Sequence, residues 1–101
     1  MTGPHQIRYL GTAEKDLTEI FEYVQRDNPT AAASLLDRFD SAIRQLSAQP
    51  FMGVIPKDDR LKRLGYRMLI VDDYLVFYVV KKRVVQVRRV IHGARRYAFL
   101  L

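Results

Sequence analysis

The chain has 101 residues, no cysteine and a formal net charge of +6 at pH 7. A chain of this length holds one hydrophobic core, so we expect a single domain over residues 1–101. Without cysteine, disulfides, cysteine-ligated zinc and thiol catalysis are excluded. His5 and His92 lie far apart in the sequence, which argues against a histidine-based metal site. We therefore expect neither a metal nor another cofactor.

The positive charge is concentrated in the last third of the chain. Residues 60–97 contain eleven of the seventeen lysines and arginines and only two acids, Asp72 and Asp73. Residues 1–59 have six basic and nine acidic side chains. This pattern indicates a polyanionic partner such as a nucleic acid. The alternative is a solvated basic face that only keeps the protein soluble.

The N-terminal part of the chain predicts a strand followed by a helix. Residues 5–11 alternate weakly between apolar and polar side chains, as a short strand does. Thr12 is a candidate N-cap for the helix, since its side-chain oxygen can accept a hydrogen bond from a free amide of the first turn. Apolar side chains then recur at helical spacing over about four turns; they are Ala13, Leu17, Ile20, Phe21 and Val24.

Asn28-Pro29 predicts the end of this helix and the start of a second one. Proline is excluded from a helix interior but suits the first helical position after an asparagine cap. The second helix stops near Pro50, and its apolar face consists of Ala32, Leu35, Leu36, Phe39, Ala42, Ile43 and Leu46. Two antiparallel helices joined by so tight a turn form a hairpin that can lay its apolar face on a sheet.

The C-terminal half predicts a loop and then three strands. Prolines, glycines and mixed charges mark residues 50–65 as a loop. The strands cover about 66–71, 74–80 and 84–92, with two short turns between them. We therefore predict an α+β fold: an antiparallel β-sheet with an N-terminal strand, a helical hairpin packed on one face and a C-terminal three-stranded meander.

The middle strand of this meander is apolar on both faces. Leu75, Phe77 and Val79 lie on one face, and Val76 and Tyr78 on the other. Such a strand belongs at the centre of a sheet, with helices over one face. In the isolated chain the second face would be an exposed aromatic patch, which suggests a binding surface.

Membrane and secretory segments are not expected. The longest apolar runs are too short to cross a membrane. No apolar stretch of signal-peptide length follows the first five residues. We therefore expect a cytoplasmic protein with no membrane partner.

His92 stands at the end of the last predicted strand, beside a basic tail. Strict alternation places Arg88, Val90 and His92 on one face of that strand, where Arg67 of a neighbouring strand could join them. Such a cluster suits RNA cleavage by attack of a 2′-hydroxyl, because arginines neutralise the phosphate and a histidine or tyrosine moves the proton. The alternative is a strand-end histidine bonded to a backbone carbonyl, with the arginines solvated.

The order of elements and several local motifs resemble the RelE/ParE superfamily of bacterial toxins, nearly from end to end. The helical motifs are Asp16-Leu17-Thr18-Glu19-Ile20-Phe21-Glu22-Tyr23-Val24, Asn28-Pro29-Thr30-Ala31-Ala32 and Ala42-Ile43-Arg44-Gln45-Leu46, with Pro50 and Gly53 after them. The motifs of the sheet are Tyr66-Arg67, Tyr74-Leu75-Val76-Phe77-Tyr78 and Arg89-Val90-Ile91-His92-Gly93-Ala94-Arg95. The resemblance implies a growth-inhibiting toxin of a type II toxin–antitoxin module, neutralised by a cognate antitoxin protein.

The resemblance leaves two targets open. RelE-like members cleave mRNA in the ribosomal A site, and ParE-like members inhibit DNA gyrase without a known nuclease step. The nuclease branch typically has an arginine just before the apolar triplet of its third strand, where this chain has Leu75. In contrast, Arg67 and the tail from His92 to Tyr97 match the nucleases, and the turn at Asn28-Pro29 resembles ParE.

The leading hypothesis is a ribosome-dependent mRNA endonuclease that needs no metal. We assign its catalytic groups to Arg67, His92, Arg95 and Tyr97, and its phosphate-binding groups to Lys62, Arg63, Arg88 and Arg96. The expected partners are an antitoxin and either the ribosome with its mRNA or DNA gyrase. Two alternatives remain: a ParE-like, non-nucleolytic inhibitor of DNA gyrase, and a non-toxic relic that binds only antitoxin or nucleic acid.

Overall fold

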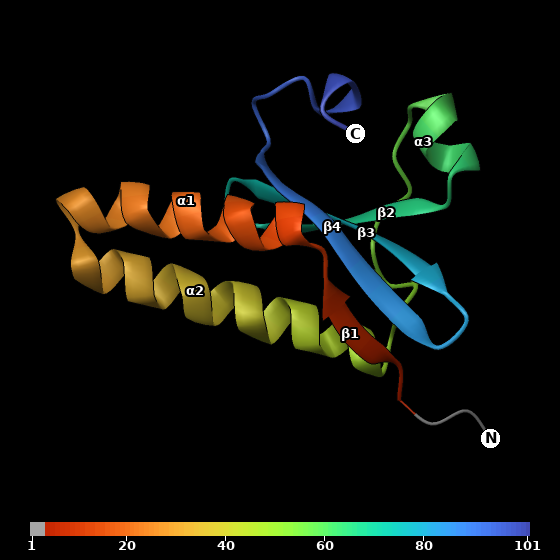
Figure 1. Cartoon of the computed structure of the whole chain (residues 1–101), viewed down its shortest axis with the longest axis horizontal. Coiled ribbons are helices and arrows are strands. Elements are labelled where there is room, and N and C mark those ends of the chain that lie inside the picture. The colour runs from red at the N-terminus through yellow and green to blue at the C-terminus, as the bar shows by residue number, and fades with distance from the viewer. Residues whose placement is uncertain (1–3) are drawn as a thin grey trace.

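The computed structural model describes residues 4–101 and has an α+β architecture (Figure 1). The predicted order of one strand, two helices and three strands is confirmed, and a short third helix precedes the second strand. The elements are β1 (Gln6–Tyr9), α1 (Gly11–Asp27), α2 (Pro29–Arg44), the 3-10 turn η1 (Gln45–Ser47), α3 (Asp59–Arg63), β2 (Tyr66–Val71), β3 (Tyr74–Lys81), β4 (Val84–His92) and the 3-10 turn η2 (Tyr97–Phe99).

The strands of the described residues form one mixed sheet in the order β1-β4-β3-β2. The meander β2-β3-β4 is antiparallel, as predicted, because its two-residue turns can join only antiparallel neighbours. β1 pairs with β4 in parallel, which corrects the prediction of a purely antiparallel sheet. The parallel pairing is possible because the chain passes through both long helices and two strands between β1 and β4, a connection long enough to bring it back in the same direction.

The two ends of the helical hairpin are fixed by different contacts. Asn28 caps α2 as predicted: its Oδ1 accepts a hydrogen bond from the Ala31 amide at 3.0 Å, and Pro29 is the first helical residue. The predicted N-cap of α1 is wrong, because that helix begins at Gly11 after Leu10. Thr12 lies inside the first turn, and its Oγ1 donates to the Arg88 carbonyl at 2.8 Å. Thr12 therefore ties α1 to β4 and does not cap the helix.

Replacing Asn28 by alanine is expected to lower the free energy of unfolding by about 1 kcal/mol, because the Ala31 amide loses the acceptor that caps α2. Urea denaturation followed by circular dichroism measures the change. Thr30→Ala is the control, since Thr30 is an exposed residue of the same helical turn and alanine favours the helix. Equal losses in both variants would contradict a capping role for Asn28.

The helical hairpin covers one face of the sheet and buries the larger core of the molecule (Figure 1). α1 runs beside β4, and α2 lies over the opposite part of the sheet toward β2. The buried residues of this core are Ala13, Leu35, Phe39, Ile43, Leu46, Leu69, Val71, Val76, Tyr78, Val85, Val87 and Val90. The sequence patterns of both helices predicted this packing.

The other face of the sheet is covered by the chain itself, which corrects the prediction of an exposed aromatic patch. Phe77 and Ile91 are 0% and 1% exposed. α3 contributes Leu61, and the C-terminal segment contributes Tyr97 and Leu100 to this second core. Residues 50–65 therefore do not form a loop alone, since they include the helix that closes this face. The sequence pattern of α3 was missed because it is only five residues long.

Arginines hold the C-terminal segment against α3 and β4. Arg60 Nη2 donates to the carbonyls of Ala98 and Leu101 at 2.8 and 3.0 Å. Arg89 Nη1 donates to the carbonyl of Leu100 at 3.0 Å. Figure 1 shows the C-terminal end beside α3. Two of the cations in the basic third of the chain are thus engaged in holding the fold.

Candidate functional site

β4 has an irregularity at the point where the candidate site was expected. Phe77 of β3 pairs with Arg89, but the next residue, Tyr78, pairs with Val87, so Arg88 is an extra residue in β4. Val87 and Val90 both pack in the core under the helices, although they are three positions apart. A β-bulge of this kind reverses the alternation of side chains beyond it. It turns Arg88 and His92 to opposite faces, contrary to the prediction that they share one.

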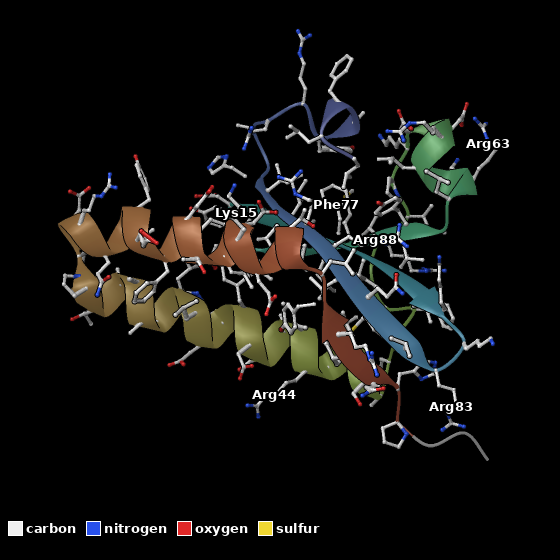
Figure 2. All side chains as sticks on the ribbon, in the orientation of Figure 1. Lys15, Arg44, Arg63, Phe77, Arg83 and Arg88 are labelled. Carbon is white, nitrogen blue, oxygen red and sulfur yellow. The ribbon has the colours of Figure 1, made fainter. Side chains whose placement is uncertain are left out.

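Arg88 packs on the face covered by α3. Its guanidinium lies 5.5 Å from the centre of the Tyr66 ring, and Nη2 donates to Gln86 Oε1 at 3.0 Å. Its Nε is buried without a hydrogen-bond partner. Arg88 is labelled beside β4 in Figure 2. Contacts of this type hold a side chain in place and leave Arg88 little freedom to follow a phosphate.

The next residue, Arg89, forms a nearly buried ion pair with Asp16 of α1. Arg89 Nε and Nη2 donate to the two carboxylate oxygens of Asp16 at 2.7 and 3.1 Å. Asp16 Oδ2 also accepts from the Val90 amide at 2.9 Å. The hydrogen bonds that Arg89 donates to Asp16 raise the pKa of the Arg89 guanidinium. This cluster fixes α1 to the bulge of β4, at the place where β1 has ended and the edge of β4 would otherwise have no partner.

Sequence reasoning missed this pair. Neither Asp16 nor Arg89 was among the candidate residues. The two side chains are 73 positions apart in the sequence. The signal in the sequence that could have revealed it is the pair of adjacent arginines, Arg88 and Arg89, between two valines of the predicted strand.

Arg67 lies at the other end of the sheet from His92. In the strand register Arg67 stands opposite Tyr78 of β3, whereas His92 stands opposite Tyr74. The offset of four residues along β3 corresponds to about 13 Å along the strands. Arg67 Nη1 donates to the carbonyls of Phe51 and Gly53 at 3.0 and 3.1 Å, and its guanidinium stands 5.2 Å over the Phe51 ring. The structure therefore does not bring Arg67 and His92 together.

His92 and Arg95 line one small pocket between α1 and the end of β4. The pocket has a volume of about 170 Å³, and its other lining residues are Asp16, Glu19, Ile20, Tyr23, Tyr74 and Val90. The His92 ring meets the Tyr74 ring edge-on at 5.3 Å, and His92 Nδ1 accepts from the Ala94 amide at 3.1 Å. That bond leaves Nε2 for a ligand. Burial raises the pKa of Tyr74, with Asp73 adding to the effect, so its phenol stays protonated at neutral pH.

The remaining candidate residues are dispersed. Tyr97 packs on Phe77, with ring centres 5.1 Å apart, and is part of the second core. Lys62 and Arg63 are exposed on α3, and Arg96 is exposed in the C-terminal segment. Of the eight residues proposed from the sequence, His92 and Arg95 line one pocket, and Lys62 and Arg67 line a separate one.

Metal-binding clusters and membrane-spanning helices are both absent from residues 4–101. These residues contain no group of three or more histidine, cysteine or acidic side chains that could hold a metal ion. No helix within the same range combines the length and apolar character needed to cross a membrane. The candidate pocket is accessible from the surface, since His92 and Arg95 are exposed.

Known proteins share this fold. The family model for the "ParE toxin of type II toxin-antitoxin system, parDE" matches residues 7–97. Among solved structures, the chain is similar to the chromosomal ParDE system of P. aeruginosa, with a TM-score of 0.74 and 17% identity over 90% of this chain and 98% of that chain. It is also similar to the RelBE2 toxin–antitoxin complex of Mycobacterium tuberculosis, with a TM-score of 0.58 and 23% identity over 88% and 98% of the two chains. No curated protein matches in sequence.

Proposed function

Because the chain belongs to the ParE toxin family of type II toxin–antitoxin systems, we propose that it inhibits growth by binding DNA gyrase, without cleaving nucleic acid. The predicted membership of the RelE/ParE superfamily is confirmed by the family match. A cognate antitoxin is the partner that this family implies, and solved structures of similar chains are toxin–antitoxin complexes. Our proposal concerns the cellular target of the toxin, DNA gyrase.

The observation that carries the gyrase proposal is the dispersal of the candidate nuclease residues. RNA cleavage needs phosphate-binding cations and a proton-transfer group around one scissile bond. Arg67 and His92 are separated along the sheet, and Arg88 faces the opposite side from His92. Tyr97 is packed on Phe77. Leu75, at the position where the nucleases typically have arginine, packs against the second core.

A second candidate function, mRNA cleavage on the ribosome, is favoured by one feature. His92, Arg95 and Tyr74 line the same pocket, and Nε2 of His92 remains available for proton transfer. An RNA-cleaving site in this pocket would have one arginine, Arg95, to bind the phosphate, whereas the hypothesis from the sequence required several. This difference makes His92 and Arg95 the residues that separate the two functions.

Induced expression in a bacterial host, with protein and DNA synthesis followed separately by label incorporation, is the first test. We expect DNA synthesis to stop first. The His92→Ala and Arg95→Ala variants are compared with the wild-type chain, and inhibition of purified gyrase is measured in a supercoiling assay. Gyrase inhibition is expected to change less than about threefold in His92→Ala, because no proton transfer is required. Loss of a general acid or base costs a nuclease about a hundredfold or more.

The two functions give opposite results. Arrest of protein synthesis before DNA synthesis, together with a harmless His92→Ala variant that remains folded, would overturn the gyrase proposal in favour of RNA cleavage. A wild-type chain with no effect on growth would identify the non-toxic relic. Circular dichroism and binding of the antitoxin serve as controls for folding in each variant.

A further inference from the structure

One end of the molecule has a group of five exposed cations. The turn between β3 and β4 contributes Lys81, Lys82 and Arg83, and α3 contributes Lys62 and Arg63. We call these five residues the basic end. Two of them, Lys62 and Lys82, line neighbouring surface hollows that share Phe51: one is also lined by Arg67 and Val80, and the other by His5 and Pro50. Figure 2 shows Arg63 and Arg83 on the same side of the molecule, away from the turn between α1 and α2.

The charges of the basic end are not neutralised by the chain itself. Within residues 4–101 the ion pairs join Arg38 to Asp72, Arg44 to Asp40 and Arg89 to Asp16, and none involves the basic end. The acids nearest to it in sequence are Asp58 and Asp59, and Asp58 accepts from the Leu61 amide as the cap of α3. The acidic turn Asp72-Asp73 joins β2 to β3, at the opposite end of β3.

Lys82 occupies a strained backbone position in this group. Its φ is +56°, in the left-handed region that glycine and asparagine adopt more readily. A lysine there costs about 1 kcal/mol relative to glycine by the general preference of the region. The sequence thus has three consecutive cations at a tight turn where a glycine would be less strained.

The surroundings of the basic end suit the backbone of a duplex better than a single strand. Single-stranded nucleic acids are bound through aromatic rings on which bases stack. Here Tyr66 and Tyr78 are 7% and 0% exposed. Phe51 is exposed, but the Arg67 guanidinium covers one face of its ring. One ring with a single free face offers a stacking place for one base, whereas each of the five cations can contact a phosphate. Phosphate contacts carry little sequence information, as in binding to a duplex backbone.

We propose that the basic end binds the phosphate backbone of duplex DNA. This inference rests on the proposed function, because a toxin bound to gyrase would lie close to the DNA that gyrase holds. The experiment that tests the DNA contact does not need gyrase. Each cation that meets a phosphate releases condensed counterions, so the affinity falls steeply with salt. The contact would lie on the turn and on α3, away from the pocket that His92 and Arg95 line.

Fluorescence anisotropy with a labelled duplex of about 20 base pairs, over a series of salt concentrations, tests this contact. The K81Q/K82Q/R83Q variant is expected to lose about tenfold or more in affinity, and the slope of log affinity against log salt is expected to fall by about 2 to 3. The matched control is K15Q/R26Q/R44Q, which removes the same charge from the two long helices. We expect it to lose less than about threefold.

Equal losses in the two variants would overturn the proposal, because they would show binding to net charge alone. Tighter binding of a single-stranded RNA of the same length would overturn the assignment of duplex DNA. Gyrase inhibition is measured separately with the same proteins. A wild-type chain that inhibits gyrase without binding DNA would overturn the DNA contact alone. One that binds DNA but spares gyrase would overturn the proposed function and support the contact.

Discussion

Replacing Asp16 by alanine is expected to lower the free energy of unfolding by about 3 kcal/mol. The Asp16 and Arg89 side chains are only 13% and 23% exposed, so the remaining guanidinium would be left largely buried without its carboxylate. The Val90 amide would also lose its acceptor. Removing one partner of a buried pair costs more than the pair contributes, because the other charge is left without compensation. Urea denaturation measures the loss.

The surface pair between Asp40 and Arg44 provides the control for this prediction. Its side chains are 55% and 78% exposed, so Asp40→Ala is expected to change the free energy of unfolding by less than about 1 kcal/mol. The double variant D16A/R89A is expected to lose less than the sum of the two single variants, because neither partner is left alone. An Asp16→Ala variant no less stable than Asp40→Ala would show that α1 is held to β4 without a contribution from this ion pair.

A methyl group added at Gly53 is expected to destabilise the protein by about 2 kcal/mol or more. The new Cβ would stand 2.5 Å from the Tyr78 hydroxyl oxygen and 3.0 Å from the Met68 carbonyl. Tyr78 is fully buried and has no space to move away. The Gly53 amide also donates to this hydroxyl at 2.9 Å, a bond that the clash would disrupt. Burial raises the pKa of Tyr78, so the phenol that accepts this bond remains neutral.

Gly11→Ala is the matched control for Gly53→Ala. No atom lies within 4 Å of a Cβ added at Gly11, and that residue begins α1. The stability of the Gly11→Ala variant is therefore expected to be unchanged or slightly higher than that of the wild-type chain. Tyr78→Phe removes the acceptor of the Gly53 amide and is expected to cost about 1 kcal/mol. Thermal and urea denaturation of the four proteins give these values. Equal stabilities of Gly53→Ala and Gly11→Ala would mean that residues 51–53 shift to accept the methyl group without a loss of stability.

Gly53 also helps to form the surface beside the basic end. Its carbonyl accepts from Arg67 Nη1, and the neighbouring Phe51 lies under the same guanidinium. Residues 51–53 therefore connect the buried Tyr78 to the surface between Lys62 and Lys82. Arg67 is engaged with this segment, which explains why it is not available to the pocket of His92.

The local elements of the fold could be read from the sequence because each depends on neighbouring residues. Helical spacing of apolar side chains predicted α1 and α2, and Asn28-Pro29 predicted the turn between them through one side-chain hydrogen bond. The three strands of the meander followed from their apolar runs and short turns. The charge of the last third of the chain was likewise fixed by composition alone.

Long-range pairing was decided by the tertiary structure. The direction of β1 depends on where the chain returns after both helices, and no local pattern records it. The second face of the sheet is closed by Leu61 and Tyr97, which lie in segments too short to show a periodic pattern. The bulge at Arg88 reversed the alternation on which the predicted cluster with His92 depended.

By itself, the sequence determined the two long helices, the meander, the N-cap of α2 and the basic character of the C-terminal part, since these properties arise within a few neighbouring residues. The tertiary structure alone decided which cations are available. Arg60, Arg88 and Arg89 are held by carbonyls, an aromatic ring and a carboxylate, whereas Lys81, Lys82 and Arg83 remain outside every ion pair of residues 4–101. The physical reason is that charge is a property of each residue, but its neutralisation depends on partners brought together from distant parts of the chain.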